Sequence, residues 1–232
     1  MADMVREIAF DTETTGLEWS GEDRIIELGA VELVNHVPTG KTFQTYVNPG
    51  RPVSEATIRI TGITDADLVD KPGFEDPSIV DAFLDFVGDA DLVAHNADFD
   101  RNFLNMELAR CGRDTIPEDR WVDTLQIAKK RHPGAPASLD ALCKRYDISL
   151  SGRAFHGALL DSQLLARAYL ELLGGRARAF DFGEQTALVD DVTVPAKQRT
   201  APLKPAQSDA ETAAHTAFVS ELGGDAIWNR YN

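Results

Sequence analysis

The chain has few cysteines and no long apolar run, and each of these absences excludes a class of protein. Its two cysteines, Cys111 and Cys143, stand far apart without a CxxC or Cys/His cluster, so neither a disulfide framework nor a structural zinc site is indicated. No apolar stretch approaches the roughly 18 residues of a spanning helix, and residues 1–7 lack the basic, then apolar, layout of a secretory signal. We therefore expect a cytoplasmic protein with no membrane role.

Basic residues are also scarce, because 23 Lys and Arg face 38 Asp and Glu, a formal charge of −15. Such a charge argues against a protein that holds nucleic acid by a broad basic surface. It does not exclude a nucleic-acid enzyme. Carboxylates gathered at one site bind divalent cations, and those cations can contact the phosphates that the bare protein would repel.

Hydrophobic periodicity divides the first three quarters of the chain into strands followed by alternating helices and strands. Period-two or continuous apolar patterns predict strands at 5–10, 24–34, 41–47 and 91–94. Helical spacing predicts helices at 79–87, 99–108 (ended by Gly112), 125–127, 138–146 (with Ser138 as N-cap) and 157–173. This order favours an α/β domain with a mixed sheet flanked by helices, over residues 1–174.

The composition changes after residue 174. Much of the apolar content there is alanine, and Pro195, Pro202 and Pro205 interrupt the stretch, so a second core is not expected and residues 175–208 are predicted to be a flexible linker. The segment 209–232 differs again. Its apolar side chains predict a short amphipathic helix with an aromatic end; they are Ala214, Phe218, Leu222, Ile227 and Trp228.

Asp11-Thr12-Glu13 follows the first apolar strand. Side chains at i and i+2 of a strand point to the same face, so both carboxylates can converge on one point. The triplet alone is weak evidence against a solvated turn, because Asp209 and Glu211 repeat its spacing in the tail. Its position favours a functional role, since it follows an apolar strand and runs into Thr14-Thr15-Gly16, a turn able to bring backbone amides near an anionic ligand.

Two further clusters, His95 to Asp100 and His156 to Asp161, each stand at the start of a predicted helix. Each has an ordinary structural interpretation. Aspartates favour the dipole of a helix N-terminus, and a single histidine there is commonly a cap or a packed residue. Residues five apart on a helix differ by about 140°, so His156 and Asp161 can share a site only if His156 lies in the preceding loop or first turn.

In this order and at these separations, Asp-x-Glu-Thr-Thr-Gly, His-Asn-x-x-Phe-Asp and His-Gly-Ala-Leu-Leu-Asp resemble the three motifs of the DEDDh 3′-to-5′ exonucleases. The resemblance covers about residues 5–173 and implies a ribonuclease-H-like fold. Within that family, residues 25–32 and 138–143 are similar to the proofreading subunits of bacterial DNA polymerase III.

The resemblance implies that Asp11, Glu13, Asp100 and Asp161 hold two divalent metal ions and that His156 is the general base. Four neighbouring carboxylates would repel one another strongly unless cations compensate them, and oxygen-only ligands suit Mg²⁺ or Mn²⁺. Because the family pattern places the ligand directly after Phe99, Asp98 is left to capping or solvent.

The resemblance also implies a set of contacts with the terminal nucleotide of a DNA 3′ end. Thr12 would contact that nucleotide, Leu17 would act as an apolar wedge, and Phe99 would pack on the base. The full expected set is Asp11, Thr12, Glu13, Leu17, Thr61, Phe99 and Asp161. At Ile60-Thr61-Gly62-Ile63 the chain departs from many relatives, which have His-Gly. A threonine at this position can still donate one hydrogen bond.

The tail suggests partners. Residues 209–232 resemble the segment that binds the catalytic (alpha) subunit of polymerase III, and Gln185, Leu188 and Val189 resemble the short Gln-x-x-Leu motifs that dock on the sliding clamp. A small accessory (theta-like) subunit is a further implied partner, and the replisome would associate the protein with the nucleoid.

Two alternatives compete with a proofreading DNA exonuclease. One is a free-standing nuclease that trims RNA or oligoribonucleotides, since recognition of the 2′-hydroxyl cannot be read from these motifs. The other is a binding module that keeps the fold without catalysis. The long tail argues against the first, and the presence of all five expected catalytic residue types argues against the second.

Overall fold

The structure is a computed structural model that describes residues 4–150, 155–175 and 208–221. The chain divides into two compact units, Met1–Gly183 and Glu184–Asn232. In the described ranges, no helix combines the length and the apolar character needed to cross a membrane. The predicted linker, apart from Gly175 and Ser208, and the clamp-motif residues Gln185, Leu188 and Val189 lie outside the described residues.

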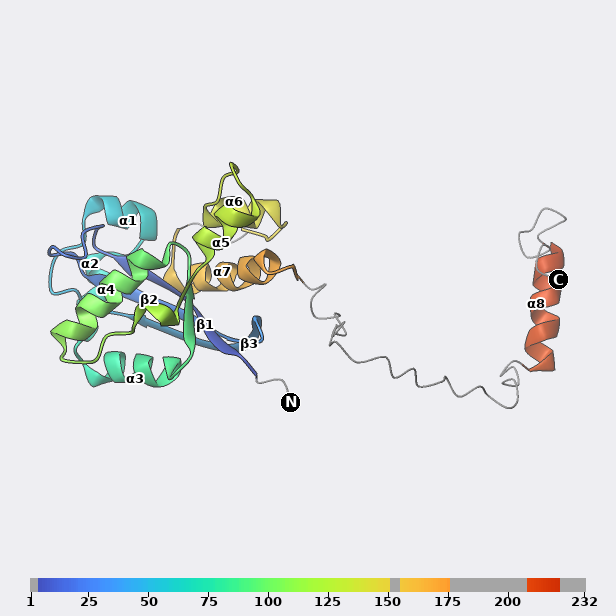
Figure 1. Ribbon diagram of the computed structural model, residues 1–232, viewed down its shortest axis with the longest axis horizontal. Coiled ribbons are helices and arrows are strands. Elements are labelled where there is room, and N and C mark those ends of the chain that lie inside the picture. Colours follow the sequence, from blue (N-terminus) through green and yellow to red (C-terminus); the bar gives the residue numbers. More distant parts are fainter. Residues whose placement is uncertain (1–3, 151–154, 176–207, 222–232) are drawn as a thin grey trace, which may run out of the picture. The chain divides into compact units, whose positions relative to one another are not determined.

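The first unit is built on a five-stranded mixed sheet with the strand order β3-β2-β1-β4-β5 (Figure 1). The first three strands form an antiparallel meander, and the last two run parallel to β1. Their bounds are β1 (Arg6–Thr14), β2 (Ile25–Val34), β3 (Val37–Tyr46), β4 (Asp91–Ala94) and β5 (Trp121–Asp123). The predicted mixed sheet is therefore confirmed, with β1 at its centre.

Helices cover both faces of this sheet (Figure 1). Ile8 and Phe10 of β1 pack with Phe83 and Phe103, from α3 (Pro77–Val87) and α4 (Ala97–Arg110). Ala9, between them, packs on the other face against α7 (Ala158–Leu172). The side chains of β1 thus alternate between two apolar layers, the pattern of a strand buried on both sides.

Most predicted elements are present, with shifted ends. Ser138 caps α6 (Leu139–Arg145), its Oγ accepting from the Ala141 N–H at 3.3 Å, as predicted. The first strand continues past Phe10 to Thr14, so Asp11 and Glu13 lie within β1 rather than in a turn after it. The short helices α1 (Glu55–Thr61) and α2 (Asp65–Leu68) were not predicted, because each is too short to establish a period. Among the described residues of this unit, the remaining helix is α5 (Thr124–Arg131), joined to α4 through a short 3₁₀ turn and β5.

In the second unit the structure describes one helix, α8 (Asp209–Glu221). Glu211 accepts hydrogen bonds from the backbone N–H and the hydroxyl of Ser208, both at 2.8 Å, which forms a capping box at its start. The predicted helix is confirmed over these residues, and Phe218 is exposed on it. Leu222, Ile227 and Trp228 lie outside the described residues.

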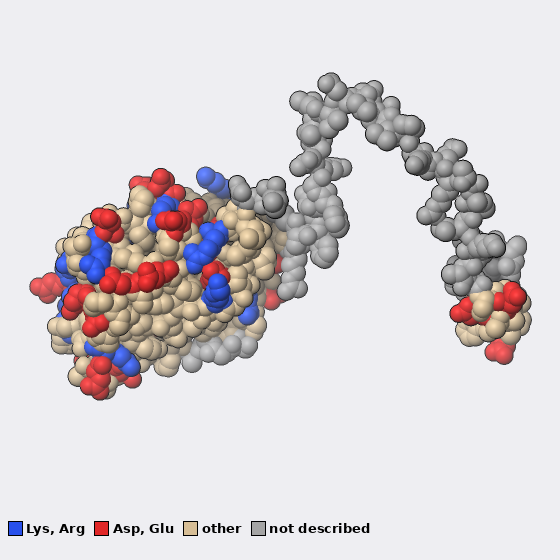
Figure 2. Space-filling model, turned by 90° about the horizontal axis from the view of Figure 1, so that it is seen from below, with Lys and Arg blue, Asp and Glu red and all other residues tan. Residues whose placement is uncertain are grey.

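Charges of both signs are interspersed on the face of the first unit that Figure 2 shows. Acidic and basic side chains alternate there, and no broad basic area covers that face. The distribution agrees with the expectation that the protein does not hold a polyanion by surface charge alone.

Candidate active site

The carboxylates of the first motif lie at the carboxyl end of the central strand. Asp11 and Glu13 alternate with Thr12 along β1, so they project toward the face covered by α7, while Thr12 projects toward α4. Thr12 meets Asp100 of α4 there. Its backbone N–H donates to Asp100 Oδ1 at 3.0 Å and its hydroxyl donates to the same oxygen at 2.8 Å.

Asp100 is held at this edge by the way α4 is anchored. The helix begins after Asn96, which adopts φ 71°, and the Asn96 N–H donates to Asp123 Oδ1 at 3.1 Å. Farther along α4, the buried Glu107 binds the Arg24 guanidinium through both of its oxygens, at 2.6 and 2.7 Å. This two-pronged contact ties α4 to the start of β2. The side chain of Asp98, in contrast, is exposed and pairs with Arg101 at 2.8 Å, as expected for a residue outside the site.

The third motif reaches the site from the opposite face of the sheet. His156 lies in the loop just before α7, whose N-cap is Gly157, which is the position required for it to share a site with Asp161. Its Nδ1 lies 3.1 Å from Asp161 Oδ2. Glu13, His156 and Asp161 offer ligand atoms that all lie within 4.8 Å of one another.

The electrostatics of this cluster are unfavourable without a cation. Burial raises the pKa of Asp11 well above its usual value, and the neighbouring carboxylates of Asp100, Glu13 and Asp161 raise it further. Burial likewise raises the pKa of Asp100 to about 7, although its hydrogen bonds from Thr12 oppose the shift. Raised pKa values at neighbouring buried carboxylates indicate a site suited to divalent cations. The cations replace the bound protons and remove the repulsion between the carboxylates.

A cavity of about 270 Å³ adjoins the carboxylates. It is lined by Thr12, Glu13, Leu17, Thr61 and Phe99, together with Thr14, Gly16, Ser54, Ala56, Thr57 and Ile60. Of the predicted nucleotide contacts, Thr12, Glu13, Leu17, Thr61 and Phe99 thus line one cavity, although the hydroxyl of Thr12 is already bonded to Asp100. The lining residues of α1 belong to no recognisable motif, so no sequence signal pointed to them beyond Thr61.

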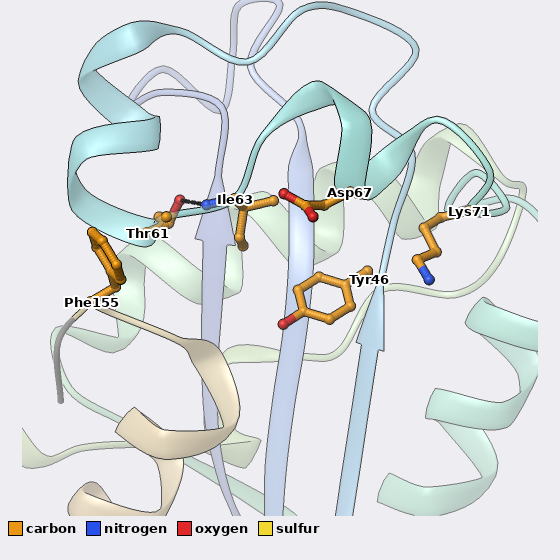
Figure 3. A pocket seen from close by; sticks show the side chains of 7 residues that line it. Tyr46, Thr61, Ile63, Asp67, Lys71 and Phe155 are labelled. Carbon is orange, nitrogen blue, oxygen red and sulfur yellow. Dashed lines mark hydrogen bonds between the residues drawn. The ribbon is translucent and has the colours of Figure 1, made fainter. Parts of the chain in front are cut away.

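Thr61 separates this cavity from a second hollow of about 310 Å³, whose other lining residues include Tyr46, Asp67, Lys71 and Phe155 (Figure 3). The Thr61 hydroxyl donates to the Thr57 carbonyl at 3.0 Å and accepts from the Ile63 N–H at 3.1 Å. Its hydrogen-bonding capacity is therefore largely used within the α1 turn, which weakens the expectation that it binds substrate.

Comparison with known proteins decides the family. The sequence profile of the Exonuclease family matches residues 8–169. DNA polymerase III subunit epsilon of Rickettsia conorii is 42% identical over 226 residues, which is 94% of this chain and 96% of that protein. The chain belongs to the DNA polymerase III subunit epsilon family of exonucleases.

Other members and structures agree with this assignment. The Escherichia coli epsilon subunit is 40% identical over 240 residues, which is 97% of this chain and 98% of that protein. The structure of exonuclease X in complex with 5′ overhanging duplex DNA matches with a TM-score of 0.57 and 29% identity, covering 73% of this chain and 91% of the other. The nuclease domain of 3′hExo, a DEDDh family member, shares the fold, with a TM-score of 0.62, 23% identity and coverage of 74% and 93%.

The predicted resemblance and fold are thus confirmed, and this epsilon family member is a 3′-to-5′ exonuclease of a class that uses divalent metal ions. The similarity to epsilon subunits extends past the exonuclease region and includes α8. Family membership does not assign roles to individual residues.

Proposed function

We propose that Asp11, Glu13, Asp100 and Asp161 hold two divalent cations, Mg²⁺ or Mn²⁺, and that His156 is the general base of the exonuclease reaction. The observation that carries this proposal is the gathering of acidic side chains from β1, α4 and α7 at one end of the sheet, where burial and mutual repulsion raise the pKa of Asp11. Such repulsion favours cations over an empty site.

The chemistry divides between the cations and the chain. Bound cations would supply positive charge to the attacking and leaving oxygens of an in-line displacement at phosphorus. His156 is suited to accept the proton of the attacking water, because half of its side chain is exposed and Asp161 fixes its ring through Nδ1. On the face covered by α4, opposite the face that carries His156, the two hydrogen bonds from Thr12 orient Asp100.

The adjoining cavity suits a terminal nucleotide without preference for its base. Leu17 is exposed by 80%, and Phe99 packs against Phe103 with ring centroids 4.9 Å apart. An aromatic face and an apolar side chain bind any base by stacking and contact, which is what removal of an arbitrary mismatched nucleotide requires.

We further propose that the substrate is the 3′ end of DNA and that the protein is the proofreading subunit of polymerase III. The support is an identity of about 40% over nearly the full length of relatives named DNA polymerase III subunit epsilon. Residues 1–174 would form the exonuclease domain, 175–208 a linker with the clamp motif Gln185, Leu188 and Val189, and 209–232 the alpha-binding segment, on which Phe218 is exposed. We also propose that the protein is cytoplasmic and that a small theta-like accessory subunit binds it.

The test uses 5′-labelled DNA and RNA oligonucleotides of matched sequence with Mg²⁺. The chain should shorten the DNA stepwise from its 3′ end, and Asp11→Ala should not. Equal or faster shortening of the RNA would support an RNA-trimming nuclease instead.

A further inference from the structure

Helix α7, which carries Asp161, has no side-chain cap of its own. Its N-cap residue is Gly157, and the first N–H groups of a helix need acceptors from elsewhere. A residue of the sheet supplies one. The Ala158 N–H donates to Glu27 Oε2 of β2 at 3.0 Å, across 131 positions of sequence.

Glu27 is an unusual residue to find at this place. It is only 1% exposed and lies opposite Glu13 in the pairing of β1 with β2. Its other oxygen, Oε1, accepts from the Gln44 side-chain amide at 2.7 Å. Both oxygens are therefore occupied by donors from the protein, which argues for a role in holding structure and against a fifth metal ligand. A buried carboxylate beside other carboxylates is costly, and the hydrogen bonds from Ala158 and Gln44 offset part of that cost.

Two residues after Glu27, Gly29 of β2 leaves room for the backbone of the first turn of α7. A Cβ added to Gly29 would lie 2.1 Å from the Ala158 carbonyl carbon and 2.2 Å from the Leu159 nitrogen. Ser162 Oγ donates to the Gly29 carbonyl at 2.9 Å. The first turn of α7 is thus seated directly on β2, with Glu27 and Gly29 on the same face of the strand.

This seat determines where the third motif lies. Asp161 is in the first turn of α7, with its N–H bonded to the Gly157 carbonyl at 2.9 Å, and His156 immediately precedes the helix. We propose that Glu27 is a positioning residue, which caps α7 from β2 and thereby fixes Asp161 and His156 against the carboxylates of β1. The proposal rests on the assignment of Asp161 and His156 to catalysis made above.

The experiment compares Glu27→Gln with Glu27→Leu. In E27Q the amide oxygen can still accept from Ala158, and its NH₂ can donate to a rotated Gln44, so the cap survives without the charge. E27Q should keep kcat within about threefold, since a neutral acceptor forms the bond at roughly half the strength. E27L removes the acceptor at similar size, and kcat should fall about 10- to 100-fold, the usual cost of a displacement near 1 Å at a reacting centre. KM for a short oligonucleotide should change less.

A second readout is independent of activity. Hydrogen exchange of the Ala158 amide, followed by NMR in the full-length chain, should be slow in the wild type and E27Q and fast in E27L. Gly29→Ala should show the same fall in kcat and the same fast exchange as E27L, because it moves the same turn. If E27L does not fold, Glu27→Asp and Gly29→Ala are measured in its place, and both should show these two changes. Equal loss of kcat in E27Q and E27L would overturn the proposal, as would full activity in E27L with a rapidly exchanging Ala158 amide. If Asp161→Ala is fully active, the catalytic assignment fails, while exchange still reports whether Glu27 caps α7.

Discussion

Thr12 donates two hydrogen bonds to one carboxylate oxygen of Asp100, from its N–H at 3.0 Å and from its hydroxyl at 2.8 Å. The two side chains meet on the face of the sheet that α4 covers, although the residues are 88 positions apart in sequence. The central strand β1 supplies Asp11 and Glu13, and through Thr12 it also orients Asp100 on α4. The residue between the carboxylates of the Asp-x-Glu motif is therefore part of the site's architecture.

Replacing Thr12 by Val removes the hydroxyl bond and keeps the backbone bond. A hydrogen bond to a charged group contributes about 1.5–3 kcal/mol, so the Mg²⁺ concentration for half-maximal activity should rise about 10-fold or more. Thr12→Ser keeps the hydroxyl and is the matched control. A T12V enzyme with the wild-type Mg²⁺ requirement would show that the hydroxyl does not orient Asp100.

The pKa shifts at Asp11 and Asp100 predict how the metal-free protein responds to pH. Burial raises the pKa of Asp100 to about 7 from 3.8, so between these values the folded chain binds more protons than the unfolded chain. The free energy of unfolding should therefore fall as pH rises through about 4 to 7 in EDTA. Saturating Mg²⁺ should restore stability at pH 8 and have less effect at pH 5.

Thermal unfolding of two variants isolates the source of this slope. Asp100→Asn removes one of the two titrating groups and should reduce the dependence on pH, leaving the part that belongs to Asp11. Asp98→Asn removes an exposed carboxylate paired with Arg101 and should leave it unchanged. An identical slope in D100N and the wild type would place the titration elsewhere.

Replacing His156 by Ala should lower kcat by about 10²- to 10⁴-fold, the usual share of a general base. The acidic limb of the pH–rate profile should become flat, because the group that must lose its proton is gone. If Mn²⁺ affinity falls and the acidic limb persists, His156 acts as a ligand. The 4.8 Å grouping with Glu13 and Asp161 makes that the specific alternative.

Deleting residues 209–232 should separate catalysis from association. Hydrolysis of short single strands should stay nearly unchanged, since the described site lies wholly in the first unit. Co-elution with the polymerase catalytic subunit in size-exclusion chromatography should be lost, together with the high effective concentration that a tether provides. A truncated chain that still co-elutes would locate the contact in the exonuclease unit.

Sequence patterns predicted this fold well where the signals are local. The predicted strand at 91–94 and the helix capped by Ser138 match the structure, because apolar spacing and cap chemistry act locally. The predicted end of the first strand, at residue 10, was four residues too early. Polar residues such as Asp11 and Glu13 continue the strand only because they pair with β2.

The site shows the same division. Motifs and their spacing pointed to Asp11, Asp100 and Asp161, but not to Glu27, whose importance depends on a bond to Ala158 that is remote in sequence. Apart from Thr61, the lining of the cavity by α1 was missed for a similar reason. Ser54 caps α1 and accepts from the Thr57 N–H, an ordinary structural role, and only the fold brings these two residues beside Glu13.

The most direct test of the central claim is the number of Mn²⁺ ions bound per chain, measured by calorimetry together with the rate of DNA hydrolysis, in the wild type, Asp11→Ala and Asp161→Ala. The four-carboxylate site predicts two ions in the wild type, fewer in each variant, and rates lower by orders of magnitude while the fold is kept. Two ions bound with undiminished activity in D11A or D161A would contradict it.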